Sequence, residues 1–243
     1  MIASAQTNTP HKLKILQRFR RAVTDTVLKG ILGAICKIEY SEFVGALSKT
    51  KPLIIVMNHI NFLEVPILVT HCRPFSCTGI AKVETWKNPI LSYLFNTYKA
   101  IPINRGGSYR ETFKKVRQAI EKGFFVVIAP EGTRSKDGVL KKAKAGIIQL
   151  AIDTDSAILP IAHFGGEKVW NNMKHFRRTS FQFKAGQPFR IKCEGRPVKS
   201  ERQVILDEIM GQIARLLPEE MRGVYSEQAE QECKHLEFIG NYA

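Results

Sequence analysis

The chain has 243 residues, of which 44% are hydrophobic, enough for one sizeable core and more typical of one large domain than of two small ones. Its 37 Lys and Arg against 22 Asp and Glu give a formal net charge of +15, so we expect an anionic partner: nucleic acid, a membrane surface or a phosphorylated substrate. The five cysteines are odd in number and contain no C-x-x-C pair, which argues against a disulfide framework and a zinc site. Since there is neither a run of roughly 20 apolar residues nor a signal-peptide pattern, the sequence indicates a cytosolic protein that can touch a membrane.

The first predicted element is an amphipathic helical segment within residues 1–40. After a polar start, apolar side chains recur at three- or four-residue spacing. This stripe consists of Leu16, Phe19, Val23, Val27, Ile31 and Ile35. Its beginning carries a basic cluster: Lys12, Lys14, Arg18, Arg20 and Arg21. The combination is typical of a helix lying in an anionic lipid interface, although a helix docked on the protein's own core has the same pattern.

From Leu53 onward, short apolar runs alternate with helical stretches, which is the pattern of βα units. The predicted strands lie near 53–57, 76–83, 100–103, 124–129, 157–163 and 180–191. The predicted helices lie at 89–98, 109–122, 143–153 and 201–217. Ser108 and Glu111 fit a capping box for the second helix, and Gly123 fits its end. We expect an α/β domain over 41–226, with a mainly parallel twisted sheet covered by helices on both faces, and a loose polar tail over 227–243.

The strand at 53–57 runs directly into Asn58 and His59. His59 is therefore expected at the carboxyl end of a strand, where open α/β sheets place their sites. Glu64, at the start of the next helix, can fold back to accept the proton on one imidazole nitrogen and leave the other as a base. A single His with an acid five positions away is a weak signal by itself, because a lone His is more often structural.

Two other strand ends carry an Arg on a loop beside glycine. The run I-N-R-G-G at 103–107 contains Arg105, and the run A-P-E-G-T-R-S at 129–135 contains Arg134. An Arg fork can bind two phosphate oxygens at once, and neighbouring glycines let backbone N–H groups approach an anion. The alternative for each Arg is a surface salt bridge. The pair of loops indicates a site for a phosphorylated ligand.

Together these segments resemble the glycerolipid acyltransferase family, above all the bacterial 1-acylglycerol-3-phosphate acyltransferases. The hallmark blocks of that family are N-H-x-x-x-x-D, a hydrophobic stretch ending in Arg, and P-E-G-T-R-S, and this chain matches their order and spacing within 35–225. The resemblance implies that His59 is the base and Glu64, in place of the usual Asp, the carboxylate that orients it. It also implies a set of substrate-binding residues: Lys82, Arg105, Glu131, Gly132, Thr133 and Arg134.

The resemblance further implies a reaction, direct transfer of a fatty acyl group from an acyl thioester to the hydroxyl of lysophosphatidate, giving phosphatidate in phospholipid biosynthesis. The donor would be acyl-CoA or acyl carrier protein, with no metal or other cofactor, and the enzyme would be peripheral or monotopic on the cytoplasmic face of the membrane. Two alternatives stay open: a different lysolipid acceptor, or a membrane-binding pseudoenzyme, because Glu64 is one methylene longer than Asp. A serine hydrolase is disfavoured because G-x-S-x-G is absent, and a nucleic-acid binder because no zinc finger, helix-turn-helix or aromatic platform is recognisable.

Overall fold

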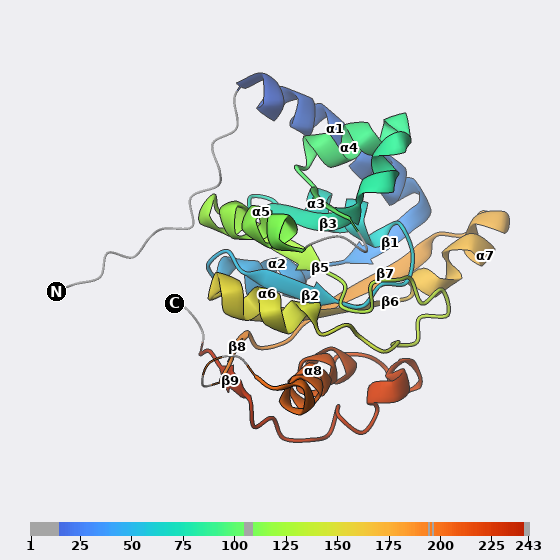
Figure 1. Ribbon diagram of the computed structural model, residues 1–243. Helices are drawn as coiled ribbons and strands as arrows, with labels where there is room; N and C mark the ends of the chain where they lie inside the picture. The colour runs from blue at the N-terminus through green and yellow to red at the C-terminus, as the bar shows by residue number, and fades with distance from the viewer. Residues whose placement is uncertain (1–14, 105–108, 194, 196, 241–243) are drawn as a thin grey trace.

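The structure is a computed structural model that describes residues 15–104, 109–193, 195 and 197–240 (Figure 1). Within them, nine strands form one sheet, whose main path runs β1-β7-β6-β2-β5-β3-β4, while β8 pairs with β6 and β9. The strands are β1 (Cys36–Glu39), β2 (Ile54–Met57), β3 (Ser76–Lys82), β4 (Ile101–Ile103), β5 (Phe124–Ile128), β6 (Ile158–Phe164), β7 (Thr179–Ala185), β8 (Phe189–Ile191) and β9 (Leu236–Phe238). The α-helices are α1 (Ile15–Ile35), α2 (Ser41–Ser48), α3 (Glu64–His71), α4 (Pro89–Thr97), α5 (Arg110–Glu121), α6 (Gly146–Thr154), α7 (Val169–Lys174) and α8 (Lys199–Ala214).

The central strand β2 accounts for the layered arrangement. All four of its residues are buried, and successive side chains of a strand point to opposite faces. Ile54 and Val56 pack in one core cluster with residues of α5, α6 and α8, whereas Ile55 and Met57 pack in the other with residues of α1, α2 and α3. Because β2 is parallel to both of its neighbours, β5 and β6, the carboxyl ends of these strands lie at one edge. The predicted α/β fold, mainly parallel with helices on both faces, is confirmed.

The predicted strand at 180–191 is wrong as a single element, because the chain is divided there into β7 and β8. Gly186 marks the break and approaches Pro160 closely: its N–H donates to Pro160 O (2.9 Å), and a Cβ on it would lie 2.8 Å from Pro160 Cγ. β7 and β8 consequently pair with different stretches of β6, both antiparallel. The other predicted strands and helices are present with shifted ends, while β1, α2, α7 and β9 are additions to the predicted pattern.

The end of the second predicted helix, α5, is confirmed by its backbone. Gly123 has a φ of +83°, and its N–H donates to Ile120 O (2.9 Å). Glycine reaches this left-handed conformation without steric cost, which suits the residue after a helix. The Ser108 half of the predicted capping box lies outside the described residues.

The expected loose tail is also wrong for the described part of residues 227–240. Strand β9 pairs with β8, and Ala229 and Leu236 are buried. Glu208 on α8 fixes the segment before β9, since its carboxylate accepts the backbone N–H groups of Lys234 (3.0 Å) and His235 (2.9 Å). Backbone bonds of this kind do not depend on apolar composition, so a polar sequence can still be held on the domain.

Helix α1 packs on the domain through the buried Leu32 and through polar side chains, while most of its apolar stripe faces outward. Asp25 is buried and accepts hydrogen bonds from Tyr98 Oη (2.6 Å) and Arg73 Nε (2.6 Å). Four residues of the stripe are 48–68% exposed, namely Phe19, Val23, Val27 and Ile31, whereas Ile35 is half-buried and packs against the core. The alternative in which these four residues pack on the protein's own core is therefore excluded. None of the described helices is both long enough and apolar enough to cross a bilayer.

The basic cluster expected on the surface of this helix is only partly there. Arg18 and Arg20 are exposed, but Arg21 is buried, with its guanidinium 5.5 Å from the centre of the Tyr98 ring. Lys12 and Lys14 lie outside the described residues. The prediction for Arg21 is wrong because the helix docks on the side that carries it, next to Asp25.

Candidate active site

His59 follows β2 at the carboxyl edge of the sheet. The buried Asn58 before it uses its side-chain amide like one more strand residue, since Nδ2 donates to His163 O (2.8 Å) and Oδ1 accepts from His163 N (2.9 Å). These bonds extend the parallel pairing of β2 with β6, whose last partners are Met57 and Ile161. The chain is thus held as far as Asn58, and His59 is the first residue beyond the sheet.

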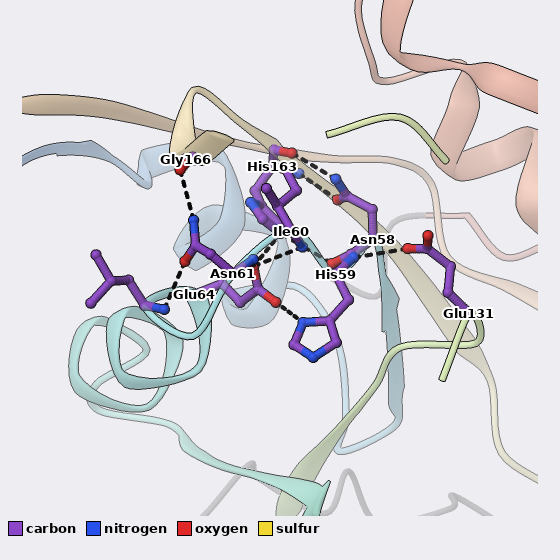
Figure 2. A network of polar contacts seen from close by, with 9 residues as sticks. Asn58, His59, Ile60, Asn61, Glu64, Glu131, His163 and Gly166 are labelled. Atoms are coloured by element: carbon purple, nitrogen blue, oxygen red, sulfur yellow. Dashed lines mark hydrogen bonds and ion pairs between the residues drawn. The ribbon is translucent and has the colours of Figure 1, made fainter. Parts of the chain in front are cut away.

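The imidazole of His59 is paired with the carboxylate of Glu64, the first residue of α3 (Figure 2). Glu64 Oε1 bonds to His59 Nδ1, and Glu64 Oε2 accepts the backbone N–H groups of Ile60 (3.2 Å) and Asn61 (3.1 Å). An ionised carboxylate only accepts, so Nδ1 carries the proton and Nε2 is the basic nitrogen. The His59 side chain is 23% exposed and that of Glu64 is 1% exposed. The predicted fold-back of Glu64 onto the imidazole is confirmed.

Asn61 fixes the turn between the base and its carboxylate. Its Oδ1 accepts the N–H of Leu63 (2.7 Å), and its Nδ2 donates to Gly166 O (2.8 Å) in the connection after β6 (Figure 2). A Cβ on Gly166 would lie 2.6 Å from Asn61 Nδ2, so this approach requires glycine. The turn from His59 to Glu64 is therefore fixed by contacts of His59, Asn61 and Glu64.

The loop at 129–135 forms hydrogen bonds to the backbone of His59. Glu131 Oε1 accepts the N–H of His59 (2.9 Å), and His59 O accepts the N–H of Ser135 (2.7 Å). Glu131 Oε2 accepts the N–H of Lys141 (3.0 Å). Both oxygens of Glu131, expected to form part of the acceptor loop, therefore contact backbone donors that position the base.

Two buried groups of this site have shifted pKa values. Burial raises the pKa of Glu131 to about 7, although the backbone donors on Lys141 and His59 oppose the shift. Burial lowers the pKa of His163 to about 4, despite its bond to Asn58. His163 is therefore neutral near pH 7, and Glu131 titrates there.

The remaining predicted residues that the structure describes lie at or near the same edge of the sheet. Lys82 is exposed at the carboxyl end of β3, which is separated from β2 by β5. Thr133 and Arg134 are exposed on the 129–135 loop, next to the residue that bonds to His59 O. Gly132 has a φ of +68°, a conformation that favours glycine. Arg105 lies outside the described residues.

The structure adds residues that the sequence analysis does not single out. Asn58, Asn61 and His163 hold the dyad, and Lys144 lies beside Gly132, where a Cβ would be 3.4 Å from Lys144 Nζ. His163 has a recognisable signal, because it is a polar residue within the otherwise apolar strand β6. The long-range partners of Asn61 have no comparable signal in the sequence.

A shallow hollow of about 380 Å³ lies elsewhere, lined in part by Asp155, Arg190 and Cys193. Asp155 precedes β6, so this hollow is at the amino end of that strand, whereas His59 is at the carboxyl edge. The paired His59 and Glu64 therefore lie away from this hollow, at the opposite end of the strands. Within the described residues, no group of three or more His, Cys, Asp or Glu could hold a metal ion.

Several known proteins are similar to this chain. The family model described as Acyltransferase matches residues 40–163, just over half of the chain. A chloroplastic 1-acyl-sn-glycerol-3-phosphate acyltransferase of Arabidopsis thaliana is 32% identical over 135 residues, which are 55% of this chain and 37% of that protein. An N-acylphosphatidylethanolamine synthase of the same plant is 32% identical over 130 residues, 49% of this chain and 46% of that protein. The chain spans less than half the length of these two relatives.

A solved structure shares the fold. It is the 1-acyl-sn-glycerophosphate acyltransferase of Thermotoga maritima, with a TM-score of 0.58 and 20% sequence identity. The match covers 79% of this chain and 78% of that one. At this identity the likeness concerns the fold alone.

Proposed function

The chain belongs to the acyltransferase family, and from this premise we propose that it transfers a fatty acyl group from a thioester to the hydroxyl of lysophosphatidate. The product would be phosphatidate, and the donor acyl-CoA or acyl carrier protein. One observation carries the proposal: a partly exposed His59 whose Nδ1 is bonded to the buried Glu64, at the edge of the sheet where ligands can approach.

The chemistry needs one proton acceptor and one proton donor, and His59 can be both. Nε2 takes the proton of the acceptor hydroxyl while that oxygen bonds to the thioester carbonyl carbon. The C–S bond then breaks, and the imidazolium, stabilised by Glu64, returns the proton to the leaving thiolate. No acyl-enzyme intermediate and no cofactor are required.

A phosphorylated acceptor suits the positive side chains at this edge. Arg134 and Lys82 are exposed there, and the side chain of Lys144 lies beside Gly132. We assign the phosphate to Arg134 and Lys82, and by resemblance also to Arg105. A charge-assisted hydrogen bond to phosphate is about twice as strong as a neutral one, so these contacts would favour lysophosphatidate over an acceptor without phosphate.

Association with an anionic membrane, peripheral or monotopic and on its cytoplasmic face, completes the proposal. The exposed stripe of α1 gives an apolar surface, and α4, which lies beside α1 (Figure 1), adds the exposed Ile90 and Leu91. Exposed Arg18 and Arg20 flank the stripe, and the net charge of +15 favours anionic lipid. Near the base, exposed Phe62 packs on Trp170 at 5.4 Å, which offers an apolar contact for an acyl chain.

The test is thiol release from palmitoyl-CoA and from palmitoyl acyl carrier protein, with lysophosphatidate, another lysophospholipid or phosphatidylethanolamine as acceptor. We expect release to depend on lysophosphatidate, with phosphatidate as the product. Preference for another lysolipid would correct the acceptor, and N-acylation of phosphatidylethanolamine would favour the activity named for the second plant relative. No transfer from either donor to any acceptor would support a membrane-binding pseudoenzyme.

A further inference from the structure

Glu64 is one methylene longer than the Asp that the family motif contains, and the structure contains a neighbour that suits the extra length. While Oε1 faces His59, Oε2 lies among the N–H groups of Ile60 and Asn61 and 3.0 Å from His163 Nε2 (Figure 2). His163 comes from β6, more than ninety residues further along the chain. The carboxylate of Glu64 thus joins a base on one side to a second imidazole on the other.

The ring of His163 is held in one place. It is 0% exposed, and the backbone of His163 is hydrogen-bonded to the side-chain amide of Asn58. The ring also stacks on Phe183, the residue paired with His163 on β7, with 5.5 Å between the ring centres. Nε2 lies 3.0 Å from Asn58 O as well as from Glu64 Oε2. Both oxygens are acceptors, so Nε2 carries the hydrogen of this imidazole.

The other ring nitrogen argues against a role in packing alone. His163 Nδ1 is buried and has no hydrogen-bond partner among the described residues. Burying a polar atom without a partner destabilises a fold, and a leucine or phenylalanine would fill the same space without that cost. The contacts made by Nε2 are what a histidine adds at this position.

We propose that His163 is a positioning residue for the transfer reaction, which holds Glu64 Oε2 so that Oε1 stays directed at His59 Nδ1. In this proposal the length of Glu64 lets its carboxylate contact His163 on β6 with one oxygen and His59 with the other. The consequence for rate rests on the proposed function, because it requires His59 to be the base. The expected effect of His163 on the orientation of Glu64 does not depend on the proposed function.

Two substitutions separate the hydrogen-bond donor from the volume of the ring. His163→Gln places an amide nitrogen near the position of Nε2, whereas His163→Leu keeps the bulk and removes the donor. We expect kcat to fall roughly 10- to 100-fold in His163→Leu, because the polar Nε2–H group 3.0 Å from Glu64 Oε2 is lost, with KM changed less than about twofold. His163→Gln should stay within about fivefold of wild type. If His163→Leu does not fold, His163→Asn is the substitute, because its amide reaches the Nδ1 position and not Nε2.

A double-mutant cycle with Glu64→Asp provides the control for general damage to the core. The shorter carboxylate should no longer reach His163. Adding His163→Leu to Glu64→Asp should therefore lower kcat by less than about threefold. An equal loss in both backgrounds would mean that His163 acts only through the fold, and would overturn the proposal. So would wild-type kcat in folded His163→Leu.

A proton NMR measurement tests the geometry without relying on turnover. A hydrogen bond from His59 Nδ1 to Glu64 should give a low-field ring N–H resonance, assigned by its loss in His59→Ala. We expect it in wild type and His163→Gln, and we expect it to be lost or broadened in folded His163→Leu. If the resonance follows this pattern but no acyl transfer occurs, the proposed function fails and the positioning role stands. An unchanged resonance in His163→Leu would overturn the role.

Discussion

At the scale of single residues, Glu131 couples the structure of the site to pH. Burial raises its pKa from the usual 4.5 to about 7, so between these values the folded protein binds a proton that the unfolded chain has released. The stability due to this group therefore falls as pH rises through that window, and levels off above the folded pKa.

A neutral side chain at this position should remove the effect. Glu131→Gln cannot ionise, so we expect its melting temperature, relative to wild type, to rise from about pH 5 to about pH 8, although the amide loses one acceptor for a backbone N–H. Thermal melts of both proteins in matched buffers would measure the difference. A difference that stays constant across the range would mean that the wild-type carboxyl keeps an ordinary pKa.

Arg134 is the described residue that most directly tests the phosphate site. Since a charged hydrogen bond is worth roughly 1.5–3 kcal/mol, Arg134→Ala should raise KM for lysophosphatidate about 10- to 100-fold and leave the donor KM nearly unchanged. Steady-state kinetics with each substrate varied in turn would show this. Lys192→Ala removes the same charge from an exposed position after β8 and is the control. A rise confined to the donor KM would contradict the assignment.

At the scale of elements, helix α1 docks on the domain through one face and exposes an apolar stripe on the other. Its docked face depends on Asp25, which binds Tyr98 and Arg73 and is buried near Arg21. We expect Asp25→Asn to destabilise the domain by about 1.5–3 kcal/mol, because hydrogen bonds to a buried charge are weakened. Urea unfolding would measure it. A change below about 0.5 kcal/mol would show that α1 is held mainly by its apolar contacts with α3.

The outward face of α1 should act on membrane binding without acting on stability. Val23 and Val27 are about half exposed, so the double substitution Val23→Asp, Val27→Asp removes apolar surface at little cost to the fold. Since burying a Val side chain stabilises by about 1.5 kcal/mol or more, we expect binding to anionic vesicles to weaken at least about tenfold. The matched control is Ala22→Asp, Thr26→Asp, which adds the same charge at exposed positions of the same helix. Equal losses in the two pairs would attribute the effect to charge and not to the stripe.

At the scale of the whole molecule, the sequence predicts the elements that follow from repeating local patterns. It does not predict contacts between residues that lie far apart in the chain. The alternation of apolar runs and helical stretches predicts the sheet, and the position of His59 after a strand predicts its place at the carboxyl edge. The stripe on α1 could not be oriented from its spacing, because an outward and an inward apolar face look the same. The packed tail and the contact of Glu64 with His163 depend on Glu208 and on β6, which no local pattern reveals.

The proposed activity of the whole molecule requires His59 as its base, and one comparison tests this claim most directly. His59→Ala should remain folded, because Glu131 and Ser135 hold residue 59 by its backbone and those bonds do not need the imidazole. We therefore expect an unchanged far-ultraviolet circular dichroism spectrum, together with thiol release from acyl-CoA and lysophosphatidate that is reduced roughly 10²–10⁴-fold. Transfer at the wild-type rate by folded His59→Ala would contradict the account.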